Sequence, residues 1–87
     1  MVDQTLINAV KNRNQDAFKQ MYEACIRYVY TIVKRYVSNE SDHNDVIQEN
    51  FVRVFLRIDT FNEKKGLFKF WLRRLTINQC IQHYRKQ

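Results

Sequence analysis

The sequence has no proline at all and only one glycine, Gly66, among its 87 residues. It also has no apolar stretch long enough to span a membrane, and it does not begin with the charged start, short apolar segment and small-residue cleavage site of a signal peptide. We therefore expect neither membrane insertion nor export, and we predict a cytoplasmic protein. No repeat, low-complexity tract or linker interrupts the chain, which predicts one small domain over residues 1–87.

Cysteine is scarce as well, and its placement argues against disulfide and metal chemistry. Cys25 and Cys80 lie far apart, without a CxxC motif and without a histidine at ligand spacing, so buried thiols are expected. Carboxylates near His43 could in principle bind a metal or transfer protons, but no nucleophile and no convergent third element accompany them. We predict no catalytic residue, no metal, no cofactor and no enzymatic activity, with His43 and His83 on the surface.

The charge of the chain is unevenly distributed. Hydrophobic residues make up 45% and charged residues 28%, which is typical of a folded domain, and the net charge is +6. Residues 1–50 carry six Lys or Arg against seven Asp or Glu, whereas residues 51–87 carry nine against two. This asymmetry predicts a polyanionic partner for the C-terminal part, with nucleic acid as the first candidate and an anionic membrane surface as the second.

Apolar residues recur at steps of three and four, which predicts helices and almost no strand. A short helix is expected at about residues 3–11, and a long one runs from near Asp16 to Tyr36. The cap-rich segment at residues 38–42 separates it from a third helix that reaches about Ile58, and a last helix runs from about Leu67 to the end. The predicted fold is all-α, a compact bundle of three main helices plus a short N-terminal helix.

The inward faces of the two middle helices follow from the same spacing. The expected buried residues are Phe18, Met21, Tyr22, Cys25, Val29, Ile32, Val33 and Tyr36 on the long helix, and Val46, Ile47, Phe51, Val54, Phe55 and Ile58 on the third.

One side of the third helix is acidic and rich in amides. Asp42, Asp45 and Glu49 have i, i+3, i+7 spacing, with Gln48 beside them, so they project together near the positive end of the helix dipole. The carboxylates could simply satisfy the helix N-terminus, or the group could dock on a partner protein. Spacing alone leaves both interpretations open.

A polar stripe follows the last helix. Arg74, Asn78, Gln82 and Arg85 have i, i+4, i+8, i+11 spacing, and Arg, Asn and Gln are side chains whose donors and acceptors match base edges. This is a plausible face for reading DNA. A solvent-exposed polar face of an amphipathic helix is the alternative.

The segment NEKKGLFKFWLRR, residues 62–74, combines backbone freedom, positive charge and rings. Gly66 permits close approach of a ligand, and Lys64 and Lys65 suit a phosphate backbone. Single-stranded nucleic acid is bound by such a positive groove with aromatic platforms. Alternatively, Gly66 caps the last helix and the rings form core. The core interpretation is favoured for Trp71 and Leu72, whereas Phe61 and the lysines are the better functional candidates.

Three segments resemble motifs of the bacterial RNA polymerase sigma factors of the extracytoplasmic-function (ECF) group. DVIQENFVRVF, residues 45–55, resembles D-L-V-Q-E-x-F-x-R-x-W, and FNEKKGLFKFWLRRLTIN, residues 61–78, resembles F-D-x-x-x-G-S-F-x-x-W-L-x-R-I-A-x-N. NRNQDAFKQMYE, residues 12–23, resembles the group's G-D-x-x-A-F-x-x-L-Y opening. The segments have the family's order and spacing, and the likeness extends over nearly the whole chain.

The resemblance implies the second region of such a factor, which binds the clamp helices of the polymerase's largest subunit and recognises and melts the promoter's minus-ten element. Three sets of residues in this sequence match functional positions of the family. Asp45, Gln48 and Glu49 match the polymerase-docking motif. Phe61, Asn62, Lys64, Lys65 and Gly66 match the loop that captures an unpaired base of the non-template strand, and Arg53, Arg74 and Asn78 match DNA-facing positions.

The resemblance also implies further partners and a longer chain. Factors of this group are commonly inhibited by anti-sigma proteins, and they normally continue through a linker into a C-terminal helix-turn-helix domain. We expect residues 1–87 to be a domain excised from such a protein; a single-domain relative with altered function is the alternative.

Three residues depart from the family pattern. Leu67 and Phe70 replace smaller residues at the predicted pocket, so base preference cannot be transferred. Asn50 replaces a typically apolar residue and is expected on the surface, either extending the docking face or without effect. A duplex-reading DNA regulator and a protein-interaction module remain alternative functions.

Overall fold

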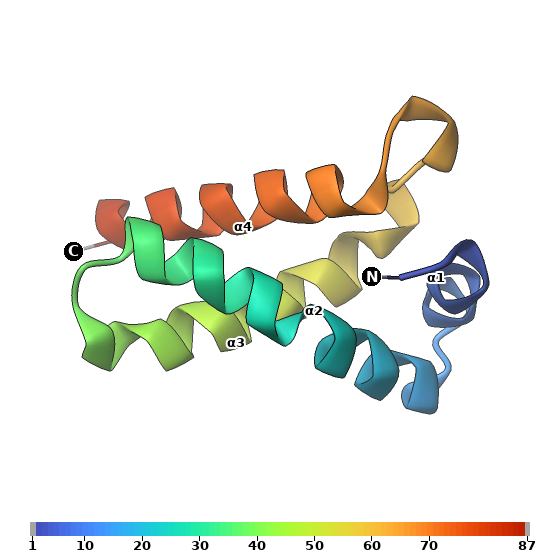
Figure 1. Cartoon of the computed structure of the whole chain (residues 1–87), viewed down its shortest axis with the longest axis horizontal. Coiled ribbons are helices and arrows are strands. Elements are labelled where there is room, and N and C mark those ends of the chain that lie inside the picture. The colour runs from blue at the N-terminus through green and yellow to red at the C-terminus, as the bar shows by residue number, and fades with distance from the viewer. Residues whose placement is uncertain (1, 87) are drawn as a thin grey trace.

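The computed structural model describes residues 2–86 and contains no strand within that range. Three long helices and a short N-terminal one form a bundle, which confirms the predicted all-α class (Figure 1). The helices are α1 (Gln4–Lys11), α2 (Gln15–Tyr36), α3 (His43–Arg57) and α4 (Phe68–Arg85), with 3-10 turns η1 (Glu40–Asp42), η2 (Ile58–Thr60) and η3 (Glu63–Lys65) between them.

Polar side chains define the starts of the first two helices. Asp3 Oδ1 accepts a hydrogen bond of 2.8 Å from the Leu6 amide, and Asn14 Oδ1 accepts one of 3.0 Å from the Ala17 amide. Between these helices the chain turns at Arg13, whose φ of 64° is in the left-handed region. The predicted boundaries of both helices lie within one residue of those observed.

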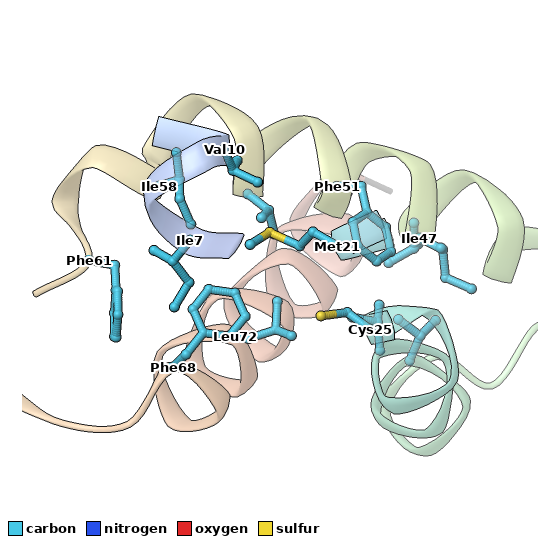
Figure 2. Close-up of a cluster of buried hydrophobic side chains, with 14 of the residues drawn as sticks. Ile7, Val10, Met21, Cys25, Ile47, Phe51, Ile58, Phe61, Phe68 and Leu72 are labelled. Carbon is cyan, nitrogen blue, oxygen red and sulfur yellow. The ribbon is translucent and has the colours of Figure 1, made fainter. Parts of the chain in front are cut away.

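The core fills the space between the four helices, and Figure 2 shows part of it. Both cysteines are buried free thiols, as predicted. Burial raises the pKa of Cys25 to about 11 and also raises the pKa of Cys80, so both remain protonated and unreactive near neutral pH.

One aromatic prediction needs correction at the end of α2. Tyr36 was expected in the core but is 41% exposed. The helix ends at Tyr36, and the extended backbone of Val37 turns that side chain inward until only 1% of it is exposed. Val37 therefore takes the core position that the helical spacing assigned to Tyr36.

The two histidines also differ from their predicted surface placement. His43 is buried, because it begins α3 beside the preceding loop and its Nε2 donates a 2.6 Å hydrogen bond to the Val37 carbonyl. His83 is partly buried on α4, with its Nε2 3.3 Å from Oδ2 of Asp42. Both side chains thus join the α2–α3 connection to the rest of the bundle.

Asn50 was expected on the surface, and this prediction is wrong as well. Its side chain is completely buried between α3 and α4, where Nδ2 donates a 2.9 Å hydrogen bond to Thr76 Oγ1. The Thr76 hydroxyl in turn donates to the Leu72 carbonyl at 2.8 Å. A polar connection therefore runs through the apolar interface of these helices.

Candidate nucleic-acid interface

The loop between α3 and α4 projects from one end of the bundle, the end that also holds α1 (Figure 1). Asn62 organises this loop, since its Oδ1 accepts a 2.9 Å hydrogen bond from the Lys64 amide and its carbonyl accepts one of 3.0 Å from the Lys65 amide. Gly66 has a φ of 155°, which side-chain-bearing residues rarely adopt. The backbone freedom predicted for Gly66 is thus used by the loop.

The loop and the start of α4 enclose a pocket, called the loop pocket below, of about 210 Å³. It is lined by Thr60, Phe61, Asn62, Lys65, Gly66, Leu67, Phe70, Trp71 and Arg74. Four of the five predicted loop residues line it, and Lys64 is the exception. The structure also brings Arg74 of the predicted α4 face into the same pocket.

Phe61 does not offer an exposed ring, contrary to the expectation of an aromatic platform there. Its side chain is only 5% exposed, and the ring packs edge-on against Phe68 with centroids 5.4 Å apart. The ring of Trp71 lies 5.8 Å away and is partly buried. Phe61 therefore supports the pocket, while the exposed ring at its edge belongs to Phe70, which is 56% exposed.

The polar face of α4 continues from this pocket. Arg74 and Asn78 are exposed and line a second groove of about 310 Å³, together with Phe70, Arg73 and Ile77. The two hollows share Phe70 and Arg74 and so form one continuous surface.

Arg53, the predicted DNA-facing residue of α3, lines neither the loop pocket nor the α4 groove. Its Nη2 donates a 3.4 Å hydrogen bond to Oε1 of Gln82, which lies one helical turn beyond Asn78. Arg85, further along α4, is exposed. The fold therefore brings Arg74 and Asn78 together, whereas Arg53 lines the groove between α3 and α4 that Glu49 also lines.

The predicted docking residues Asp45, Gln48 and Glu49 are all exposed on α3. Gln48 Nε2 donates to the Tyr22 hydroxyl at 3.4 Å, and Glu49 Oε2 accepts a 2.9 Å hydrogen bond from Nε2 of Gln79, a residue only 2% exposed. None of the three docking residues lines the loop pocket. We call these three residues the docking face.

Two apolar residues next to the docking face were missed. Val52 and Leu56 are 57% and 72% exposed on α3, and with Glu49 they line a groove of about 440 Å³ between α3 and α4. They follow Gln48 at steps of four, off the core stripe, so the sequence contained a signal for them. A solvent-exposed valine and leucine in series are typical of a protein-binding surface.

Residues 2–86 contain neither a candidate metal centre nor a membrane-spanning helix. In this part of the chain, no three His, Cys, Asp or Glu side chains gather where a metal ion could be held. None of the helices described has the length and apolar character needed to cross a membrane.

These features define a small helical domain with a cationic pocket and groove that suit a nucleic acid, beside a separate exposed face. Residues 21–87 match the family model described as Sigma-70 region 2. The chain belongs to this family, which confirms the resemblance found in the sequence.

Curated proteins with similar sequences are named as ECF RNA polymerase sigma factors. The chain is 32% identical over 81 residues to the ECF RNA polymerase sigma factor SigW of Bacillus subtilis, an alignment that covers 93% of this chain and 43% of SigW. It is 31% identical over 78 residues to the ECF RNA polymerase sigma-E factor of Escherichia coli K12, with 90% and 40% covered. The chain thus spans less than half the length of these relatives.

A solved structure has a similar fold. It is the NMR structure of an engineered region 2 of sigmaE in complex with GTAAAA. The likeness covers 100% of this chain and 90% of that one, with a TM-score of 0.88 and 30% sequence identity. The sigma region 2 fold is therefore confirmed.

Proposed function

We propose that this chain is the part of an ECF sigma factor that binds core RNA polymerase and recognises and melts the promoter's minus-ten element. The observation that carries the proposal is the loop pocket, whose 210 Å³ would accommodate one unstacked base. Its walls combine the Asn62 amide and the cations of Lys65 and Arg74 with the rings of Phe70 and Trp71. Membership of the Sigma-70 region 2 family supports the same role.

Base capture follows from the chemistry of these walls. Unpairing and unstacking a base costs a few kcal/mol, which stacking on rings and contacts with phosphates must offset. Phe70 supplies an exposed ring, and Lys65 and Arg74 supply positive charge. Because Asn62 Oδ1 is occupied by the Lys64 amide, its Nδ2 is the group that would donate to an acceptor on the base.

The groove along α4 would hold the adjoining promoter DNA. Arg74 and Asn78 lie one turn apart and are both exposed, so they can reach phosphates or base edges. Arg53, which contacts Gln82 of α4 from the groove between α3 and α4, would meet DNA that extends beyond Asn78. The non-template strand would thus pass from this groove into the loop pocket.

The docking face would bind the clamp helices of the polymerase's largest subunit. Asp45, Gln48 and Glu49 are exposed there, and Val52 and Leu56 add apolar area next to them. Polar groups around an apolar centre are the usual composition of a protein interface. An anti-sigma protein that covered this face would block polymerase binding, and we propose such an inhibitor as a further partner.

The proposal makes the protein a binding factor and not an enzyme, because no covalent bond in the DNA changes. It also places the protein in the cytoplasm with the polymerase and the chromosome. The relatives are more than twice as long as the chain, in keeping with a second, helix-turn-helix domain in the whole factor.

Binding to core RNA polymerase tests the proposal directly. We expect the wild-type chain to bind tightly and the pair Gln48→Ala/Glu49→Ala to lose most of the affinity, with helicity by circular dichroism unchanged. The pair Gln20→Ala/Glu23→Ala removes the same residue types from an exposed part of α2 and should bind like the wild type.

Two results would contradict the assignment. A wild-type chain that does not bind polymerase would remove the sigma role for this chain. If the same chain then bound intact duplex DNA unaided, the duplex-reading regulator would replace it as the preferred function.

A further inference from the structure

Lys11 at the end of α1 and Arg13 in the turn after it reach across the fold to the segment before the loop pocket. Lys11 Nζ donates a 2.8 Å hydrogen bond to the Phe61 carbonyl and lies 5.8 Å from the centroid of the Phe61 ring. Arg13 Nη1 donates to the Phe55 carbonyl at 2.7 Å, and its Nη2 pairs with Asp59 Oδ2 at 2.9 Å. These contacts join α1 to residues about forty to fifty positions further along the chain.

Apolar packing holds α1 in the position these contacts require. Ile7 and Val10 of α1 are buried beside Ile58 and Phe61, as Figure 2 shows. The left-handed backbone at Arg13 ends the turn after α1 and begins the approach to α2. The helix is therefore packed against η2, directly before the loop.

No residue of α1 lines the loop pocket, yet Lys11 holds the peptide group from which the pocket's polar wall begins. The Phe61 carbonyl carbon is bonded to the amide nitrogen of Asn62, and the peptide unit is planar, so fixing the Phe61 oxygen fixes the orientation in which Asn62 starts. Asn62 in turn orders the Lys64 and Lys65 amides. The contact is partly buried and has a charged donor, which makes it stronger than an exposed neutral hydrogen bond.

We propose that Lys11 is a positioning residue for the loop pocket: through the Phe61 carbonyl it sets the geometry with which the pocket distinguishes one base from another. This inference rests on the proposed function. It differs from a direct role of Lys11 as one more cation for the phosphate backbone, and the two roles predict different changes in DNA binding.

Binding of the chain to single-stranded hexanucleotides separates the two roles. The probes are GTAAAA and its single-base variants, with affinities measured by fluorescence anisotropy at several salt concentrations. For Lys11→Met we expect the ratio between the best and worst hexamer to fall about tenfold, because a charge-assisted hydrogen bond is lost. The dependence of affinity on salt should stay as in the wild type.

Two control variants define the result. Lys11→Arg keeps a charged donor and should keep the base discrimination, and Lys19→Met removes a charge from an exposed part of α2 and should change nothing. The inference is overturned if Lys11→Met weakens all hexamers equally and makes the salt dependence shallower by about 0.7 in log–log slope, as loss of one phosphate contact to a single strand does.

Amide hydrogen exchange of the DNA-free chain tests the positioning separately. We expect the Lys64 and Lys65 amides to exchange about tenfold faster in Lys11→Met, while amides in the middle of α2 are unaffected. Unchanged exchange in the loop overturns the positioning role even if DNA binding is altered. A wild-type chain that binds no hexamer overturns the DNA part of the proposed function, and the exchange rates then decide the role of Lys11 alone.

Discussion

Asn50 and Thr76 form a polar pair inside the interface of α3 and α4, and neither side chain is exposed. They occupy positions where the ECF motifs have a typically apolar residue and an alanine. Asn50 Oδ1 is buried and has no hydrogen-bond partner among the described residues. A polar group left unpaired in the interior lowers stability, so the pair does not simply add to it.

Substitutions at these two residues should be strongly coupled. Thr76→Val keeps the shape but leaves the Asn50 amide without its acceptor, and we expect the free energy of unfolding to fall by about 1–3 kcal/mol. Adding Asn50→Leu removes the stranded amide and should recover at least half of that loss. Chemical denaturation of both single variants and the double variant gives the coupling. Losses that simply add would contradict this account.

Among the elements, α3 has the most divided role, with its buried side on α2 and α4 and its exposed side on the docking face. Val52 and Leu56 on the exposed side contribute little to the bundle, since more than half of each side chain is open to solvent. Their exposure in a chain with so small a core is explained if a partner covers them.

A charge placed at Leu56 should therefore affect binding and not folding. We expect Leu56→Asp to lower the affinity for core RNA polymerase at least tenfold, because a desolvated carboxylate would face the partner. The melting temperature should stay within a few degrees of the wild type. Leu67→Asp is the matched control, since Leu67 is 63% exposed in the loop, and it should bind polymerase normally. Equal losses in both variants would argue against an apolar contact at Leu56.

The positions of the helices could be predicted from the sequence because apolar spacing and cap residues are local signals. The same signals failed where a polar residue is buried, as at His43 and Asn50, since hydrophobicity alone assigns such residues to the surface. Phe61 was placed by its neighbours in the sequence, whereas its ring is buried by Phe68 and Trp71. Lys11 and Phe61 are fifty residues apart, and no periodic pattern in the sequence predicts that they meet.

The whole molecule is electrostatically divided, with nine Lys or Arg against two Asp or Glu in residues 51–87 and a slight excess of acid before them. The loop pocket and the α4 groove both lie in the basic part. Binding of a polyanion there releases counterions, so affinity should depend steeply on salt.

We expect the logarithm of the hexanucleotide affinity to fall linearly with the logarithm of salt concentration. Lys65→Gln should weaken all sequences and reduce the slope by about 0.7, the contribution of one phosphate contact to a single strand. Arg27→Gln, on an exposed part of α2, serves as the charge-matched control and should leave the slope unchanged. Titrations followed by anisotropy give both slopes, and identical slopes for Lys65→Gln and the wild type would place the phosphate path elsewhere.

Adjacent residues of α4 belong to different surfaces: Asn78 lies in the exposed groove, and Gln79 is buried where it holds Glu49 of the docking face. One residue added or deleted here would rotate the rest of the helix by about 100°. The side chains of the groove and of the Glu49 contact would then no longer face their present partners. An insertion or deletion between the start of α4 and Asn78 should therefore disturb the α4 groove and the Gln79–Glu49 contact together. Substitutions that keep the register of α4 leave both surfaces in place.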